Sequence, residues 1–594
     1  MGQRCPNNQI MSLGTEKTFY SYVSPALFLV LVWGFIIWFI GPSGEFMIND
    51  DWSFIKALQI VTCDGCVPAT GWGDGGPSLL THLIWGFAFT KIFGFSVTVL
   101  RVSVLVMAVL ASVALMVFLK RIGASSSLAF WGALNLIANP LFLSQSFTFM
   151  TDVTLVGIMI FSALFITEGI ERQSRILVAV GLVFALAALL TRQIAIAIPV
   201  TLILFTFIHP KARQMGKFQI FMMTVLIAII PWVGFEIALK KFGSTSLTDH
   251  EVIHRMISDP LALGVYGYLR LLSERLAFGI GYVSVLVSPV VALSLKELYS
   301  RKVFRTYFKV LTVFFILLQT GILTGMFHPS VVFFRNIIID FGIGPLLLKD
   351  TYLMNIPRVW QIPPTLYYCL AYLSAISAFA IAIMAYSSIS NILFPARKCD
   401  IDAPNTASTF SLALSMIYSG TILFTGYHDR YLIPVFVFII IWIVSAKAKS
   451  LNLVFWKRSL IPAFIVMIIM GLFSVGGVHD LVRTKLALKQ AQDYVVNDLA
   501  VPPCSLDGGF EFNGYNCYNK GYVQKPGLSW WWVDREDFLL TLGPLPGYTV
   551  EKIFPFQRVF PTDGAVYVLK NDDQTPPHSV GLTTDKNIDS RSKN

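Results

Sequence analysis

Thirteen apolar segments of membrane-spanning length recur along this chain, and they constrain its fold more than any other feature. A hydrocarbon core about 30 Å thick needs roughly 20 consecutive apolar residues in a helix. We therefore predict a polytopic α-helical membrane protein with about 13 transmembrane helices. The segments are residues 23–40, 97–119, 127–143, 152–168, 176–190, 194–208, 218–239, 274–294, 310–326, 365–394, 407–425, 431–445 and 461–478.

The composition agrees with this class of protein. Hydrophobic residues make up 55% of the 594 residues and charged residues only 13%, whereas soluble domains carry about 25% charged residues. The net charge of +11 would suit nucleic acid, but the Lys and Arg residues lie mostly in short clusters between the apolar segments. That is the pattern of positive-inside topology. We expect the lipid bilayer as a partner and no nucleic acid.

The basic clusters set the expected topology. A cytoplasmic N-terminus places most of them on the cytoplasmic side, as the positive-inside rule requires, and Lys240-Lys241 is the exception. The opposite face then receives residues 41–96, 144–151, 191–193, 240–273, 327–364, 426–430 and the tail from residue 479. We expect an integral protein of the bacterial inner (plasma) membrane whose C-terminal domain is extracytoplasmic.

One apolar run, residues 79–93, does not fit this alternation. It is short, contains His82 and Lys91, and follows a Gly-Gly-Pro sequence. We predict an interfacial helix at the outer boundary of the bilayer. An ordinary span is the alternative, and it would reverse every later loop.

The chain divides into two predicted domains. Residues 1–478 form the transmembrane domain, with residues 41–96 as its long first outer loop. Residues 479–594 are polar, lack a further span and are long enough for a small soluble α/β domain. Alternating apolar residues predict strands near residues 547–553 and 564–569. The last ~20 residues have the composition of a disordered end.

Four cysteines fall on the predicted outer side, where an oxidising compartment favours disulfides. The simplest pairings are Cys63 with Cys66 and Cys504 with Cys517. The Cys63-Asp64-Gly65-Cys66 sequence could instead hold zinc, but zinc needs two more ligands that the sequence does not supply.

Two adjacent carboxylates follow the first apolar segment closely, in Asn49-Asp50-Asp51-Trp52. A poorly solvated carboxylate near the hydrocarbon boundary suits general-base work on an acceptor hydroxyl. A solvated acidic loop is the alternative. The sequence makes Asp50 and Asp51 candidate catalytic residues without choosing between them.

Asp152 stands where the second outer loop meets the fourth apolar segment. It is a third candidate for catalysis, because the topology places it at the same membrane face as the carboxylate pair. A first-turn acid of a helix needs no function and is the alternative explanation.

Arg192 and Arg430 also lie at this face, against the positive-inside bias. A guanidinium group binds phosphate bidentately, so a phosphate at the membrane surface would explain both. The neighbouring Tyr427 and His428 are further candidates for binding the substrate. An ion pair between Arg430 and Asp429, or a side chain that extends to the interface, would explain Arg430 without function.

These residues together resemble the GT-C class of integral membrane glycosyltransferases. The similarity is greatest to the bacterial branch related to protein O-mannosyltransferases and to the lipid A aminoarabinose transferase. The matching pieces occur in the expected order over residues 49–434. They are Asn49-Asp50-Asp51-Trp52 with the apolar stretch after it, Phe93-Gly94-Phe95-Ser96 with Leu100-Arg101, Asn139-Pro140, Thr151-Asp152, Thr191-Arg192-Gln193 and Asp429-Arg430-Tyr431-Leu432-Ile433-Pro434.

The resemblance implies an inverting transfer of a sugar from a polyprenyl-phosphate donor to an acceptor of the cell envelope, without a nucleotide. It implies that Asp50 is the base, that Asp152 orients the acceptor or the base, and that Arg192 and Arg430 hold the leaving phosphate. The class often has Asp-Glu where this chain has Asp50-Asp51, so the choice between the two stays open. Some members depend on a divalent metal, and no motif here identifies one.

Two other functions fit a membrane protein of this kind. A flippase or transporter for lipid-linked glycans would favour charged residues within the spans and internal symmetry, and the sequence has few of the former and no internal repeat. A glycan ligase should lack the early pair of carboxylates. We therefore expect a glycosyltransferase and keep a transporter or ligase as the alternative.

Overall fold

The structure of this chain is a computed structural model. It describes residues 15–64, 79–241, 247–323, 337–339, 342–344, 346–358, 363–393, 405–425, 428–454, 460–519, 521–529, 531–559 and 563–572.

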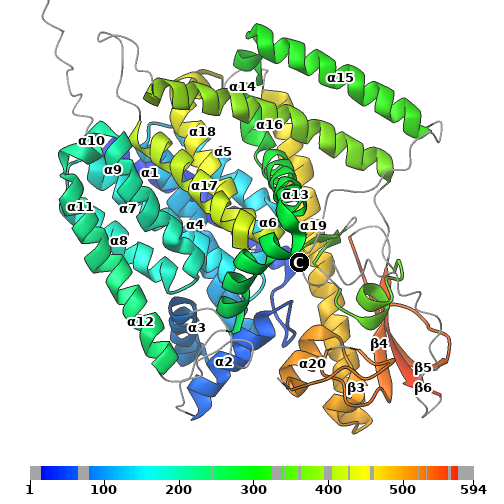
Figure 1. The fold of residues 1–594 in the computed structure, drawn as a ribbon. Coiled ribbons are helices and arrows are strands. Elements are labelled where there is room, and N and C mark those ends of the chain that lie inside the picture. The colour runs from blue at the N-terminus through cyan, green and yellow to red at the C-terminus, as the bar shows by residue number, and fades with distance from the viewer. Residues whose placement is uncertain are drawn as a thin grey trace, which may run out of the picture.

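Helices make up most of the described chain, and a small sheet lies at one end (Figure 1). The helical part contains α1 (Thr15–Ile40), α2 (Asp51–Asp64), α3 (Leu80–Phe93), α4 (Val97–Arg121), α5 (Ser126–Ala138), α6 (Pro140–Ser146), α7 (Thr151–Glu171), α8 (Arg175–Leu189), η1 (Gln193–Ile196), α9 (Ala197–Ile208), α10 (Pro210–Gln214), α11 (Lys217–Thr224), η2 (Val225–Ile229), α12 (Ile230–Lys241), α13 (Leu247–Leu286), α14 (Ser288–Tyr299), α15 (Lys302–Leu323), α16 (Pro364–Leu393), α17 (Thr406–Thr425), η4 (Asp429–Leu432), α18 (Ile433–Val454) and α19 (Ile461–Asp493). The other elements are β1 (Ile338–Ile339), β2 (Gly342–Ile343), η3 (Lys349–Leu353), η6 (Tyr494–Asp498), η7 (Pro503–Ser505), β3 (Leu506–Asp507), α20 (Phe510–Cys517), β4 (Phe538–Thr541), β5 (Tyr548–Phe556) and β6 (Gly564–Asn571).

The chain is an integral membrane protein with several membrane-spanning helices. Helices occupy each of the thirteen predicted segments. Within the described residues, seven helices are long and apolar enough to cross a membrane, or up to nine if two bent pairs each count as one span. The α3 helix over the predicted interfacial run has 14 residues, or about 21 Å at 1.5 Å per residue, which is shorter than the hydrocarbon core.

Two predicted spans are each divided by a sharp bend. The first break separates α5 from α6 with a bend of 68°. Pro140 begins α6 and lacks the N–H that would continue α5, while Asn139 Oδ1 accepts the Leu141 N–H at 2.8 Å and caps the new helix. The second break, of 69°, separates the end of α13 from α14.

A helix occupies most of the predicted outer loop over residues 240–273, and the side of the membrane on which this segment lies stays a prediction. Helix α13 begins at Leu247 and runs to Leu286, with a break in helical geometry at Gly264, where φ is 63°. Glycine tolerates the left-handed conformation at this kink.

The sheet confirms both strands predicted in the tail. Its order is β3-β4-β6-β5, with β3 parallel to β4 and the other neighbours antiparallel. The predicted strands correspond to β5 and β6, which pair along their whole length apart from one irregularity between Val550 and Lys552. The apolar faces of α19 and the sheet form a separate buried cluster that includes Leu488, Val495 and Leu540. The predicted disordered end lies outside the described residues.

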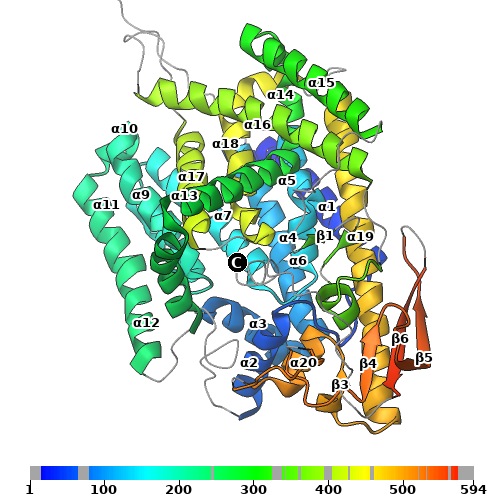
Figure 2. The same ribbon diagram turned by 45° about the vertical axis from the view of Figure 1, so that its right-hand side comes forward.

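Helix α19 joins the bundle to the sheet (Figure 2). Its 33 residues extend about 50 Å at 1.5 Å per residue. The predicted domain division at residue 478 falls inside this helix, so the two parts share one rigid element.

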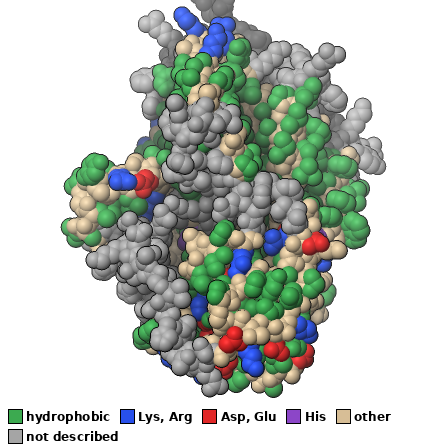
Figure 3. Space-filling model, turned by 90° about the vertical axis from the view of Figure 1, so that its right-hand side faces the viewer, with side chains coloured by type: hydrophobic (Ala, Val, Ile, Leu, Met, Phe, Trp, Pro, Cys, Tyr) green, Lys and Arg blue, Asp and Glu red, His purple; other side chains and the backbone are tan. Residues whose placement is uncertain are grey.

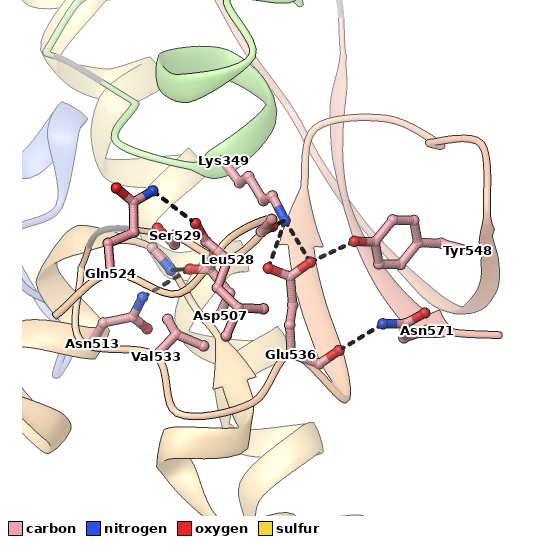
Figure 4. A network of polar contacts seen from close by, with 12 residues as sticks. Lys349, Asp507, Asn513, Gln524, Leu528, Ser529, Val533, Glu536, Tyr548 and Asn571 are labelled. Carbon is pink, nitrogen blue, oxygen red and sulfur yellow. Dashed lines mark hydrogen bonds and ion pairs between the residues drawn. The ribbon is translucent and has the colours of Figure 1, made fainter. Parts of the chain in front are cut away.

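A second connection runs from the segment before α16 to the sheet (Figure 4). The Lys349 ammonium donates to both carboxylate oxygens of Glu536 at 2.7 Å, and the Tyr548 hydroxyl donates to the same carboxylate. Burial raises the pKa of the Glu536 carboxyl, and the charge of Lys349 opposes that shift. This buried pair fixes η3 to the sheet.

The surface differs between the two parts (Figure 3). Hydrophobic side chains cover much of the helical part seen in this view, whereas acidic and basic side chains gather over the part that carries the sheet. This distribution suits one part in lipid and one in water.

The structure contains a disulfide between Cys504 and Cys517, whose Cα atoms lie 5.7 Å apart. Replacing both residues with Ser should lower the free energy of unfolding by about 3 kcal/mol, because a loop of this length is no longer closed in the unfolded chain. Apparent melting temperatures in detergent would measure the loss. The matched control is Cys369→Ser, which removes an exposed free cysteine on α16 and should leave the melting temperature unchanged.

Candidate active site

The Asn49-Asp50-Asp51 sequence forms the turn that begins α2. Asn49 adopts φ 59°, a left-handed conformation that Asn tolerates better than most residues. The segment before the turn is held by Arg101, whose guanidinium donates to the main-chain oxygens of Pro42 and Phe46 and lies 3.9 Å from the Phe46 ring centroid. Arg101 therefore fixes how the chain approaches the turn.

Asp51 points into the protein and is fully buried. Its Oδ1 accepts the Ile48 N–H at 2.8 Å, and its Oδ2 accepts the Phe149 N–H at 3.4 Å. The carboxyl group thereby stabilises the turn through Ile48 and connects it to the segment before α7 through Phe149. Its environment leaves no open side for a substrate among the described residues.

Asp51 should give the protein a pH-dependent stability with a definite sign. Burial raises the pKa of the Asp51 carboxyl from its usual 3.8 to about 8. Between these values the folded chain keeps a proton that the unfolded chain releases, so the free energy of unfolding falls as the pH rises. The Asp51→Asn variant keeps an oxygen for the Ile48 N–H but does not titrate.

We therefore expect the apparent melting temperature of the wild type to fall more than that of Asp51→Asn between about pH 5 and pH 8. Each pKa unit that separates the folded from the unfolded state is worth about 1.4 kcal/mol. Melting curves at a series of pH values measure the difference. Parallel curves for the two proteins would show that Asp51 is ionised in both states.

Asp50 lies on the other side of the turn, and 18% of its side chain is exposed. Its Oδ2 accepts a hydrogen bond from Arg430 Nη2 at 2.8 Å, although the two residues are 380 positions apart. The main-chain oxygen of Asp50 accepts from the Ser53 hydroxyl at 2.8 Å, which fixes its backbone. Of the two carboxylates, Asp50 is the one that is partly exposed.

Arg430 is almost fully buried, with 6% of its side chain exposed. Only Nη2 contacts Asp50; within the described residues, the buried Nε and Nη1 atoms have no hydrogen-bond partner. A buried guanidinium with unused donors is costly unless an anion or water completes its shell. These two donors are therefore available to an anionic ligand.

Asp152 and Arg192 form a second pair of the same kind. Asp152 lies in the first turn of α7, and Arg192 immediately precedes η1. Arg192 Nη1 donates to Asp152 Oδ1 at 2.9 Å. The structure thus brings four of the predicted site residues together as two ion pairs, Asp50 with Arg430 and Asp152 with Arg192.

The Tyr431 ring connects the two pairs. The guanidinium carbon of Arg192 lies 4.4 Å from the ring centroid and that of Arg430 lies 5.6 Å from it. Both distances are within the range of a cation–π interaction. Two cationic groups from distant parts of the sequence therefore lie near one aromatic ring.

The other predicted residues near Arg430, namely Tyr427, His428 and Asp429, do not belong to the two ion pairs. The exposed His428 ring meets Tyr431 edge-on at 5.1 Å, and Tyr427 lies outside the described residues. Asp429 does not form the alternative ion pair with the Arg430 side chain. Its carboxylate accepts the Arg430 N–H at 2.8 Å and the Ile337 N–H at 2.9 Å, so it organises backbone instead.

The cysteine and metal predictions have different outcomes. The Cys504–Cys517 pairing is present. Cys66 lies outside the described residues, as does the side chain of Cys63.

No three His, Cys, Asp or Glu side chains in the described ranges are grouped so that they could hold a metal ion. Within these ranges, the divalent metal that the sequence left open therefore has no set of ligands.

Sequence reasoning missed Glu511, which contacts the turn, and Lys485, which pairs with Glu511. Glu511 of α20 accepts the Asn49 N–H at 2.9 Å and pairs with Lys485 of α19 at 2.6 Å. Glu511 lies 462 positions from Asn49. No local motif marks either residue, and only their position in the fold reveals the contact.

One family of known sequences matches part of the chain. Residues 77–235 match the family described as dolichyl-phosphate-mannose-protein mannosyltransferase, which confirms the predicted resemblance over these residues. The matched range includes Asp152 and Arg192 but ends before Arg430 and begins after Asp50. No curated protein matches the chain.

Two solved structures are similar at a low level. The crystal structure of ArnT from Cupriavidus metallidurans in the apo state has 13% sequence identity and a TM-score of 0.35, and the alignment covers 83% of this chain and 84% of that one. The structure of the same protein bound to undecaprenyl phosphate gives 13% identity and a TM-score of 0.34, with 84% and 85% covered. Because the TM-scores and the sequence identity are this low, neither structure carries an argument about the site.

Proposed function

We propose that this protein is an inverting glycosyltransferase that moves a sugar from a polyprenyl-phosphate donor to an acceptor of the cell envelope. The observation that supports it most is the two partly buried Arg–carboxylate contacts, Asp50 with Arg430 and Asp152 with Arg192, which both lie near Tyr431. The similarity of residues 77–235 to a mannosyltransferase family supports the same reaction class. Membrane-embedded helices suit a donor with a lipid tail.

In the proposed reaction, Asp50 takes the proton of the acceptor hydroxyl. The acceptor oxygen forms a bond to the anomeric carbon, while the bond from that carbon to the phosphate oxygen breaks and its electron pair leaves with the phosphate. One carboxylate is then protonated and the polyprenyl phosphate gains a negative charge. A general base of this kind contributes roughly 10²–10⁴-fold to the rate.

Arg430 and Arg192 stabilise the charge that develops on the departing phosphate. Arg430 uses Nη2 for Asp50, which leaves Nε and Nη1 for phosphate oxygens. Fixed cationic donors in a poorly hydrated site interact with such a charge far more strongly than in water. Asp152 holds the Arg192 guanidinium in place from the first turn of α7.

We also propose the topology that this reaction needs. The site lies at the extracytoplasmic face of the plasma membrane, the N-terminus is cytoplasmic, and the C-terminal domain is extracytoplasmic. The distribution of basic clusters and the Cys504–Cys517 disulfide support this orientation, because disulfides persist in oxidising compartments.

The test is an assay of purified protein in membranes with a panel of polyprenyl-phosphate sugars. Mass changes on extracted glycolipids and envelope glycans would identify the transferred sugar and the acceptor. We expect transfer from one or a few members of the panel, with release of polyprenyl phosphate and inverted configuration at the anomeric carbon. Movement of the intact donor across the bilayer without cleavage would support a flippase instead.

A further inference from the structure

We infer that Glu511 and Lys485 of the C-terminal part are positioning residues that hold the catalytic turn in register with Arg430. This inference rests on the proposed function, since it assigns the two residues to the site that contains Asp50. It gives the C-terminal domain an indirect part in the transfer reaction, through the backbone next to Asp50.

The contact is made through one backbone group. Glu511 Oε1 accepts hydrogen bonds from the Asn49 N–H at 2.9 Å and from Lys485 Nζ at 2.6 Å. The side chains of Lys485 and Glu511 are 4% and 9% exposed, so water competes little for either. The Asn49 N–H belongs to the residue directly before Asp50. Glu511 therefore fixes the backbone on one side of the proposed base, and Ser53 fixes it on the other.

A second contact holds α2, the helix that follows the turn. The Trp52 ring packs among Phe510, Tyr518 and Trp532, with ring centroids 5.6–6.2 Å apart. Gly514 allows this packing, because a Cβ atom there would lie 2.5 Å from Trp52 Cε2. Trp52 sets where α2 sits on the C-terminal part, and Glu511 sets the conformation of the turn that precedes it.

The Lys485–Glu511 pair differs from an ion pair whose only role is to stabilise the fold. A buried ion pair can often be replaced by apolar side chains of similar volume without loss of stability. Such a replacement here would also remove the acceptor of the Asn49 N–H, and the turn would no longer be fixed at that point. A displacement of about 1 Å in a catalytic group can reduce the rate about 10²-fold.

Two double variants separate positioning from stability. Both contain Lys485→Met, and they carry either Glu511→Gln or Glu511→Leu. Gln and Leu are similar in size and both remove the charge, but only Gln keeps an oxygen for the Asn49 N–H. We expect the Leu variant to have a kcat about 10–100-fold below that of the Gln variant, with KM for the donor within about twofold, because Arg430 and Arg192 are unchanged.

The control for charge removal on the same helix is Lys489→Met. Lys489 pairs with Asp493 on α19 and lines the same cavity of about 190 Å³ as Lys485, but its partner Asp493, unlike Glu511, makes no hydrogen bond to the turn. Its kcat should equal that of the wild type. Equal kcat values for the Gln and Leu variants, with both proteins folded, would overturn the inference.

Hydrogen exchange provides a readout that does not need transferase activity. The peptide around residues 47–53 should exchange faster in the Leu variant than in the Gln variant, while peptides from α4 and α7 stay equally protected in both. If this difference appears but Asp50→Asn retains full transfer activity, the positioning contact stands and the proposed base is wrong. If Asp50→Asn is inactive but exchange and kcat are the same in the two variants, the positioning role is wrong and the proposed function stands.

Discussion

Replacing Asp50 with Asn should reduce kcat for sugar transfer by roughly 10²–10⁴-fold, the usual contribution of a general base. Asn is nearly the same size and retains an oxygen for Arg430 Nη2, which Asp50 contacts at 2.8 Å. The variant therefore removes the proton acceptor with little change in packing. Because both Arg residues remain, we expect KM for the lipid-linked donor to change by only a few fold. Initial rates at several donor concentrations would measure both parameters.

The matched control for this variant is Asp537→Asn. Asp537 also pairs with an arginine, Arg535 at 3.1 Å, but the two side chains are 46% and 67% exposed on the C-terminal part. Exposed pairs contribute little, so this variant should retain wild-type activity. Asp51→Asn should lose less activity than Asp50→Asn if both proteins fold. Undiminished transfer by Asp50→Asn would exclude Asp50 as the base, and the opposite order would assign that role to Asp51.

Replacing Arg430 with Gln should reduce kcat/KM by about 10²–10³-fold, the loss typical for one donor to a developing negative charge in a preorganised site. The guanidinium is 6% exposed, contacts Asp50, and has two further donors with no protein partner in the described part of the chain. Arg430→Lys keeps the charge but not the planar set of donors, so its loss should be smaller but still measurable. Inhibition by the product polyprenyl phosphate should weaken in the same order, because the phosphate is the shared ligand.

Arg535→Gln is the control, since it removes the same group from an exposed ion pair. It should leave kcat/KM and product inhibition unchanged. If Arg430→Gln lost transfer activity but kept wild-type affinity for polyprenyl phosphate, Arg430 would act only by holding Asp50. Full activity in Arg430→Gln would remove it from the site.

The candidate residues could be found from local patterns, whereas their partners could not. Asp50, Asp152, Arg192 and Arg430 stood out because each is a charged group close to the end of an apolar segment. Hydropathy reveals such positions, because a charged side chain near lipid has a high free-energy cost and is therefore rare unless it has a function. Which carboxylate pairs with which guanidinium depends on contacts between residues up to 380 positions apart, and local patterns contain no such distances.

Asp50 and Asp51 illustrate the same limit at adjacent positions. The residue pattern alone did not choose between them, and the family resemblance pointed to Asp50 as the base without excluding Asp51. The turn buries Asp51 against the Ile48 and Phe149 amides and leaves Asp50 partly exposed beside Arg430. Neighbouring residues in a turn point in different directions, so tertiary contacts decided which one faces the site.

The sequence by itself determined that this is a membrane protein of many helices with a small α/β domain at its end, because hydrophobic runs and strand alternation are local properties. Only the tertiary structure decided where helices bend, how the two ion pairs meet at Tyr431, and that the C-terminal part contacts the Asn49-Asp50-Asp51 turn through Glu511. The physical reason is that short-range hydrogen bonds and ion pairs act over a few ångströms in space. The fold alone sets which distant residues come that close.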